Sequence, residues 1–367
     1  MVMIHSAAFS LSLVVSLFVA LAIILTQRFH GHLTHDSHSG VQKLHHAPTP
    51  RVGGVALCAG AVAGGLLLPE GTRALWWVMS LSALPALVFG LIEDVTKRVG
   101  VKTRLLATIC SGLIFCVASG YHVAQVGLPG LDLIFAFAAF AIPFTAFAVG
   151  GVANAINLID GVNGLASGTS IIILAGFGVV AAQVGDQQLL GISLVLAGAL
   201  GGFFLMNFPM GRIFLGDAGA YATGFMLAAL AVALPARNPE VSPLVGLLAL
   251  SYPVTETMVS IHRRLVRAGT NPGQADRLHL HSLIYRSRAR RLAGILGAPQ
   301  LRNALSGLVV MGLPFLSTVL MVLFRESTPL LLVAIALVTV VYLVIYRKVA
   351  LLGGITLALR PRAMSEA

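Results

Sequence analysis

The chain alternates between long apolar stretches and short polar segments over most of its length. Eleven stretches approach the roughly 20 apolar residues that a helix needs to cross a bilayer. They fall at 8–27, 53–68, 75–92, 104–119, 132–149, 169–185, 189–206, 218–234, 243–262, 304–324 and 329–346. This pattern predicts an all-α integral membrane protein, a polytopic bundle of about 11 transmembrane helices that forms one domain over residues 1–367.

The composition agrees with lipid as the main solvent, because 57% of the residues are hydrophobic and only 10% are charged. The first apolar stretch is long, lacks a basic flank and precedes no small-residue cleavage site, so we expect a retained helix rather than a cleaved signal. Cys58, Cys110 and Cys116 lie within predicted spans. They fit neither a metal-ligand spacing nor a disulfide framework.

The distribution of positive charge predicts the orientation of the chain. If the amino terminus is external, alternate loops and the carboxyl tail, together with Arg104, carry 21 of the 24 Lys and Arg residues. Cytoplasmic loops of membrane proteins are enriched in these cations, so the carboxyl terminus should be cytoplasmic. The cations lie between apolar spans, and we therefore expect a lipid partner and no nucleic acid despite a net charge of +11. The larger cytoplasmic pieces would be 28–52, about 263–303, and the tail 347–367.

Five polar islands fall on the same predicted membrane face. They cover 43–54, 93–104, 154–168, 214–219 and 263–281. They contain the acids Glu93, Asp94, Asp160, Asp217 and Asp276, out of 13 in the chain. Such a gathering predicts an active site on the cytoplasmic face of the membrane.

Asn154, Asn157 and Asp160 recur every third residue, which on a helix turns each side chain about 60° from the last and keeps all three on one face. Gly161 and Gly164 follow and would let the backbone approach a ligand closely. The alternative is a helix broken by glycine, whose amides only bond to neighbouring helices.

Asp217 stands between Gly216 and Gly219 at the mouth of a predicted span. A carboxylate there is suited to a hard cation, which prefers oxygen ligands. The alternative is that Asp217 caps the helix that follows.

The carboxylate pair Glu93 and Asp94 ends another span and is followed by Lys97, Arg98, Lys102 and Arg104. A cluster of this kind can hold a metal, a proton acceptor and phosphate oxygens together. Alone it could equally be an interfacial anchor.

Three further segments carry polar chemistry. Arg277, His279 and His281 offer a guanidinium and two imidazoles for phosphate or sugar oxygens, too few ligands for zinc. Arg51 lies at the start of the second span, where it could bind an anion or act only as a positively charged anchor at the membrane surface. Glu256 lies inside the ninth span, where an ionisable group usually faces the protein interior or a water-filled cavity.

The first loop is rich in histidine, at positions 30, 32, 35, 38, 45 and 46. Irregular spacing without Cys or carboxylate partners disfavours a metal site. We favour a linker that leads to His45.

In this order the motifs resemble those of the polyprenyl-phosphate N-acetylhexosamine-1-phosphate transferases, the membrane superfamily that includes phospho-N-acetylmuramoyl-pentapeptide transferase. The resemblance covers about residues 43–285. It rests on Lys43 and His45 with 50–54, on Glu93 and Asp94, on 154–164, on 214–219 and on 276–281. Each motif is short and weak alone. The resemblance is specific because all five occur in the same order along one predicted topology.

The resemblance implies a Mg²⁺-dependent enzyme, with Mn²⁺ as a substitute, that moves a sugar 1-phosphate from a UDP-sugar to undecaprenyl phosphate and releases UMP. Asn157 and Asp217 would hold the metal, with Glu93, Asp94 and Asp160 as further catalytic acids. The implied substrate contacts are Lys43, His45, Arg51, Lys102, Asn154, Asn163, Arg277, His279 and His281. The bacterial inner membrane and a homodimer are implied as well.

Some positions depart from the family pattern: Glu93 replaces an Asp, Asn163 stands where many bacterial members have Asp, and Ser282 replaces a third His. The 276–281 segment favours the branch that starts O-antigen, teichoic acid or capsule synthesis. Lys97 resembles the peptidoglycan branch instead. The donor sugar cannot be read from the chain.

Two alternatives to this enzyme remain. A transporter or lipid flippase would place polar groups near the bilayer midplane and repeat one half of the chain, and neither is visible. The second alternative is a catalytically inactive scaffold of the same fold, which the departures from the family pattern would permit.

Overall fold

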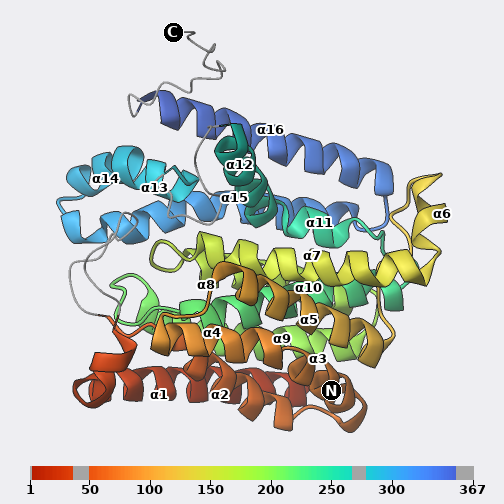
Figure 1. The fold of residues 1–367 in the computed structure, drawn as a ribbon, viewed down its shortest axis with the longest axis horizontal. Coiled ribbons are helices and arrows are strands. Elements are labelled where there is room, and N and C mark those ends of the chain that lie inside the picture. Colours follow the sequence, from red (N-terminus) through yellow and green to blue (C-terminus); the bar gives the residue numbers. More distant parts are fainter. Residues whose placement is uncertain (1, 36–48, 267–277, 353–367) are drawn as a thin grey trace, which may run out of the picture.

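A computed structural model describes residues 2–35, 49–266 and 278–352. Long helices lie side by side, with α1 and α16 at opposite outer sides of the bundle (Figure 1). The long helices are α1 (Val2–Thr34), α5 (Val101–Ser119), α7 (Ala138–Ile159), α8 (Leu165–Gln183), α9 (Gln187–Asn207), α10 (Gly216–Arg237), α15 (Arg302–Phe324) and α16 (Thr328–Leu352). The shorter ones are α2 (Gly53–Leu66), α3 (Glu70–Ser82), α4 (Leu84–Thr96), α6 (Leu131–Phe135), α11 (Val245–Ala249), α12 (Ser251–Val266), α13 (Leu280–Ile284) and α14 (Arg290–Ile295).

The all-α membrane class is confirmed. Within the described ranges, eight helices are long and apolar enough to cross a membrane, and α3 with α4, bent by 46°, would be a ninth. Every predicted apolar stretch coincides with a helix or a broken pair. The count of eleven spans stays a prediction, because α2 has only 14 residues and the ninth stretch is divided into α11 and α12.

Proline explains the breaks between α3 and α4 and between α11 and α12. Pro85 lies at the start of α4 and Pro253 at the start of α12. Proline has no backbone N–H, so it cannot donate the hydrogen bond that would continue the preceding helix. It is tolerated in the first turn, where that bond is absent in any case. The chain therefore restarts a helix at each position.

Helix α10 lies at the centre of the bundle and packs on α2, α4, α7 and α8. Its membrane-spanning window is 89% buried. Small residues allow the close approach: a Cβ added to Gly90 of α4 would lie 2.6 Å from the Cα of Ala218 in α10. In lipid, such van der Waals contact is a main source of helix association. The packing fixes the first turn of α10, and with it Asp217, between α2, α4 and α7.

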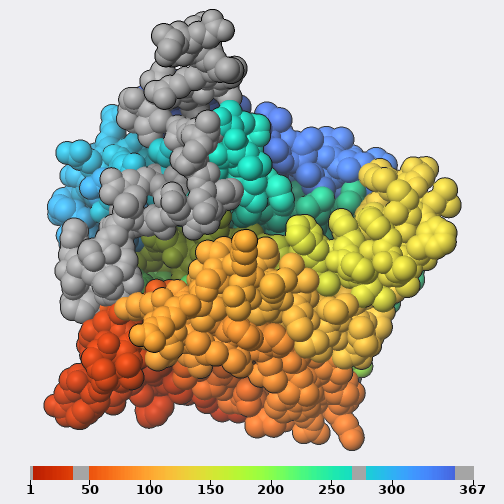
Figure 2. Space-filling model, viewed as in Figure 1, coloured from red at the N-terminus to blue at the C-terminus, as the bar shows by residue number. Residues whose placement is uncertain are grey.

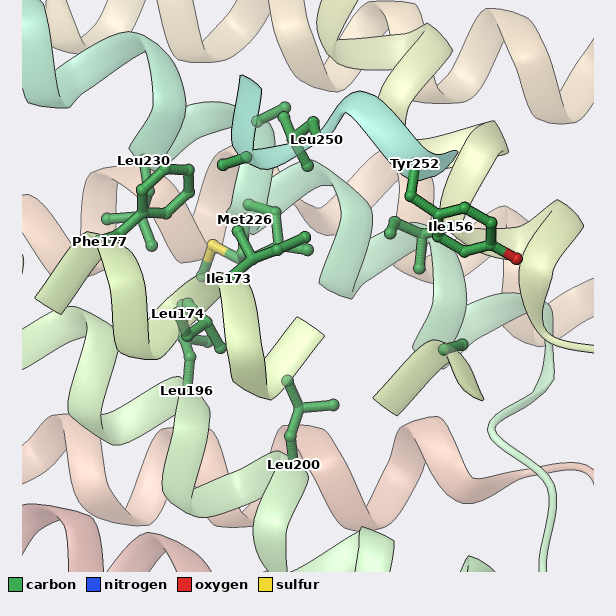
Figure 3. Close-up of a cluster of buried hydrophobic side chains, with 14 of the residues drawn as sticks. Ile156, Ile173, Leu174, Phe177, Leu196, Leu200, Met226, Leu230, Leu250 and Tyr252 are labelled. Atoms are coloured by element: carbon green, nitrogen blue, oxygen red, sulfur yellow. The ribbon is translucent and has the colours of Figure 1, made fainter. Parts of the chain in front are cut away.

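Large apolar side chains fill the space between α7, α8, α9 and α10 (Figure 3). Ile156, Ile173, Phe177 and Met226 are among those buried there. On the face drawn in Figure 2, side chains cover most of the space that the ribbons leave between α4, α5 and α7. The tightly packed core gives the polar end of the bundle a rigid support.

Candidate active site

The segment before α2 lies beside the segment before α10. The Gly53 amide donates to the Phe214 carbonyl at 2.9 Å, and the Phe214 amide donates to the Pro50 carbonyl at 2.8 Å. The Gly54 amide adds a third bond of 2.9 Å to the Leu215 carbonyl. Two motifs more than 150 residues apart in sequence are thereby joined through their backbones.

Asp94 is fully buried and faces the start of α10. Its carboxylate accepts hydrogen bonds from the amides of Asp217 at 2.8 Å and Ala218 at 2.9 Å. The guanidinium of Arg51 lies 3.2 Å from the same carboxylate. Asp94 thus supplies acceptors for amides that a helix leaves unpaired in its first turn. Asp217 is not the cap of α10, because Leu215 occupies the N-cap position and Asp217 lies within the first turn.

Gly216 makes this contact possible. Its φ angle is +75°, a conformation that residues with a side chain rarely adopt. A Cβ at this position would lie 2.6 Å from Asp94 Oδ2 and would also strike the Arg51 carbonyl. The glycine before Asp217 is therefore required by both backbone conformation and space.

Side chains from four of the five polar islands meet at Asp217, which is buried. Its Oδ1 accepts hydrogen bonds from Arg51 Nη2 and from Asn157 Nδ2, each at 3.1 Å. Its Oδ2 accepts from the guanidinium of Arg104, which also lies 4.0 Å from Glu93 Oε1. The predicted convergence of Arg51, Asn157 and Asp217 is present at one end of the bundle.

The three-residue face of α7 is divided between two neighbourhoods. Asn157 contacts Asp217, and Asp160 follows at the end of the helix, where burial, followed by the charge of Asp217, raises its pKa to about 7. Asn154 instead donates to Thr108 Oγ1 of α5 at 3.0 Å. The side-chain amide of Asn154 therefore bonds to a neighbouring helix, as the alternative interpretation of this motif expects.

Asn163 is buried and held by structural contacts. Its Nδ2 donates to the Pro209 carbonyl at 2.8 Å, and its backbone amide donates to Asn303 Oδ1 at 2.6 Å. These bonds tie the turn after α7 to the α9–α10 connection and to α15. The implied substrate contact of Asn163 would have to use its side-chain oxygen, because Nδ2 already donates to Pro209.

Arg104 belongs to the charged cluster seen in the sequence but is not among the substrate contacts that the resemblance implies. Lys102, which is among them, is exposed and forms no salt bridge with the described residues. Side chains two residues apart on a helix point about 200° apart, so only one of these cations can face the acids. The sequence alone does not select Arg104, because the rotation of α5 against α10 decides which of the two cations faces Asp217. Lys97 donates to the His35 carbonyl at 2.9 Å instead of to an acid.

His279 and His281 are buried beside the end of α7. Their rings stack with centroids 5.5 Å apart, and the His281 ring lies against Gly161. Burial lowers the pKa of His281 to about 4, and the neighbouring His279 adds to this effect. His279 Nδ1 lies 3.1 Å from the carboxylate of Glu256, which is fully buried as its sequence position predicts. The predicted residues Lys43, His45, Asp276 and Arg277 lie outside the described residues.

The arrangement suits an anion and a hard cation together. Among the described residues, no three His, Cys, Asp or Glu side chains form a metal cluster. Mg²⁺, however, is commonly held by one or two carboxylates together with water and substrate phosphates. The oxygens of Asp217 and Asn157 fit that donor set. Arg51 and Arg104 bring guanidinium groups that suit phosphate oxygens.

Comparison with known proteins finds relatives over most of the chain. The glycosyl transferase family 4 model matches residues 76–235. A probable undecaprenyl-phosphate N-acetylglucosaminyl 1-phosphate transferase of Bacillus subtilis is 27% identical over 84% of this chain and 82% of its own length. A decaprenyl-phosphate N-acetylglucosaminephosphotransferase of Mycobacterium leprae is 30% identical over 65% and 67%. A phospho-N-acetylmuramoyl-pentapeptide-transferase of Streptococcus pyogenes is 31% identical over 53% and 61%.

The helical membrane fold and these relatives together define a membrane-embedded phospho-sugar transferase. The chain belongs to glycosyl transferase family 4. The resemblance drawn from five short motifs is thereby confirmed, and an enzyme is favoured over a transporter.

Proposed function

We propose that the protein transfers an N-acetylhexosamine 1-phosphate from a UDP-sugar to undecaprenyl phosphate and releases UMP. The observation that carries this proposal is the meeting of Arg51, Arg104 and Asn157 at Asp217. The polyprenyl phosphate and the N-acetylglucosamine 1-phosphate in this proposal come from the names of the Bacillus and Mycobacterium relatives.

The reaction needs alignment and charge neutralisation more than covalent help from the protein. A phosphate oxygen of the acceptor attacks the sugar-bearing phosphorus, and the bond to the UMP oxygen breaks. Arg51 and Arg104 would donate to the diphosphate oxygens, and Asp217 with Asn157 would hold Mg²⁺. The metal would supply Lewis-acid neutralisation of those oxygens.

The structure supports a positioning role for Asp94. Both of its oxygens already accept from the amides of Asp217 and Ala218, and Arg51 lies beside them. The acceptor phosphate is already anionic near neutral pH, because its second pKa is about 6. Removal of a proton is therefore a small part of the chemistry, whereas alignment of α10 determines where Asp217 stands.

We further propose the bacterial cytoplasmic membrane as the location, with the amino terminus outside, the carboxyl terminus inside and the site at the inner leaflet. The product would start a lipid-linked surface glycan. The peptidoglycan reaction is the second candidate, favoured by the Streptococcus relative but over a smaller part of the chain. A homodimer stays a prediction.

The test is an assay of purified protein in detergent with Mg²⁺, undecaprenyl phosphate and a panel of UDP-N-acetylhexosamines. We expect UMP release that depends on both substrates and stops when EDTA is added. Failure with every donor, under conditions that support a known relative, would overturn the proposal. Turnover only with UDP-N-acetylmuramoyl-pentapeptide would establish the second candidate.

A further inference from the structure

Glu256 of α12 is a fully buried carboxylate outside the Asp217 cluster. Its Oε1 lies 3.1 Å from His279 Nδ1, and its two oxygens accept from the Leu280 amide at 3.2 and 3.3 Å. Its Oε2 accepts from the Tyr342 hydroxyl at 2.9 Å. Burying a carboxylate is costly unless it is fully hydrogen-bonded, and here three groups from two other segments satisfy it.

These contacts determine where the proton of His279 lies. An ionised carboxylate only accepts hydrogen bonds, so Nδ1 must carry the hydrogen that is shared with Glu256. The other ring nitrogen, Nε2, is left for a different partner. The arrangement matches the general case in which a histidine donates one N–H to a carboxylate and uses the second nitrogen at a site.

The ring of His279 is directed by its surroundings as well as by Glu256. It stacks on His281, whose ring lies against Gly161 at the end of α7, next to Asp160. On the other side, the Tyr346 hydroxyl of α16 donates to the Leu278 carbonyl at 3.0 Å. Helices α12 and α16 together fix the segment that carries both histidines beside the acids.

We propose that Glu256 is a positioning residue for His279: its carboxylate holds the imidazole with a hydrogen on Nδ1, so that Nε2 faces the donor substrate, where it accepts from a sugar hydroxyl or, in the imidazolium form, donates to a phosphate oxygen. Tyr342 holds the carboxylate in place. The identity of the ligand rests on the proposed function, whereas the protonation state of the ring does not.

The first experiment measures that protonation state without any substrate. The ¹⁵N spectrum of histidine-labelled protein, with His279 assigned by its loss in His279→Asn, should show a protonated Nδ1. In Glu256→Gln we expect the His279 signals to shift. An unprotonated Nδ1 in the wild-type protein would overturn the proposal, even if the transferase assay succeeds. A protonated Nδ1 in a protein without transferase activity would refute only the proposed function.

The second experiment is a double-mutant cycle in the transferase assay with a radiolabelled donor. Glu256→Gln should lower kcat by about tenfold to a hundredfold, the usual effect of removing a partner that orients a histidine. In a His279→Ala background the same change should cause no further loss, because Glu256 acts through His279. An equal loss in both backgrounds, or a fall only in melting temperature, would contradict the positioning role.

Two matched variants sharpen the result. Tyr342→Phe removes the hydroxyl that holds Glu256 and should lower kcat only a few-fold. Asp186→Asn makes the same acid-to-amide change in a buried cluster at the other end of the bundle, and should lower the melting temperature without changing kcat. A fall in kcat for Asp186→Asn equal to that for Glu256→Gln would show that the effect is general destabilisation, and would refute the assignment.

Discussion

The two ends of α10 carry buried ionic clusters of different kinds. At its last turn, Arg237 donates to Asp186 at 2.7 and 3.3 Å, so one cation faces one anion. At its first turn, Asp217 shares Arg51 and Arg104 with Asp94 and Glu93, and Asp160 lies close by. The first cluster pairs one acid with one guanidinium group, whereas among the described residues the second has more acids than guanidinium groups. That excess of carboxylates fits the cation that the proposed phosphoryl transfer would use.

Hydrogen bonding separates the same two clusters. Asp186 also accepts from the Leu189 amide and from Asn238, and it caps the start of α9. Burial opposes its ionisation, but the bonds from Arg237 and Leu189 prevail and lower the pKa of Asp186. Burial instead raises the pKa of Asp160. This is the contrast expected between a cluster that stabilises the fold and the proposed reaction site.

The largest expected effect comes from Asp217→Asn. The change keeps the side-chain volume but removes the charge that faces Arg51 and Arg104, and it removes a ligand for Mg²⁺. We expect a loss of kcat of at least about a hundredfold, by analogy with the removal of one transition-state contact. Steady-state kinetics and the melting temperature of the same preparation test this. Near-normal turnover would refute the assignment of Asp217.

Arg104→Gln should follow, with a loss of kcat of about tenfold to a hundredfold, since a charge-assisted hydrogen bond to the reacting phosphates is removed. Lys102→Gln is its matched control, because the two cations lie two residues apart on α5 and only Arg104 reaches Asp217. The test is to measure kcat of both variants at a saturating concentration of the donor substrate. A larger loss for Lys102→Gln would mean that the cation at the phosphates is the exposed one.

Asp186→Asn should affect stability and not catalysis. Loss of the bonds to Arg237 should lower the free energy of unfolding by about 1–3 kcal/mol, because a buried polar partner is left unsatisfied. Thermal unfolding in detergent measures the change, and kcat should stay at the wild-type value. A fall in kcat without a fall in melting temperature would contradict the division between the two clusters.

The smallest effect is a dependence of that stability on pH. The folded pKa of Asp186 is depressed below its ordinary value of 3.8, so its stabilisation is present above about pH 4 and is lost as the pH falls through the folded value. The difference in melting temperature between wild type and Asp186→Asn should therefore shrink below about pH 4. A difference that stays constant down to pH 3 would argue against an ionised Asp186.

Much of the fold and part of the site could be predicted from the sequence. Apolar stretches mark helices because lipid leaves few other solutions for the backbone, and polar islands on one face had to meet if they formed one site. The meeting of Asn157 with Asp217 follows from that reasoning.

Other contacts in the site join residues that are far apart in sequence, and no local sequence pattern predicts them. The carboxylate of Asp94 bonds amides 123 and 124 residues away, and the choice of Arg104 over Lys102 depends on the rotation of α5 against α10. The side chain of Asn154 is directed toward Thr108, which belongs to a different helix. Such contacts are fixed by tertiary packing and are not encoded in residue spacing.

The close contact between Gly90 and Ala218 constrains how this enzyme can acquire a new substrate. An added methyl group at Gly90 would meet the α10 backbone at 2.6 Å and would separate Asp94 from the amides it holds. A larger residue at Gly90 would therefore displace the first turn of α10, and Asp217 with it. Directed evolution of the proposed site toward other donor sugars should leave Gly90 unchanged.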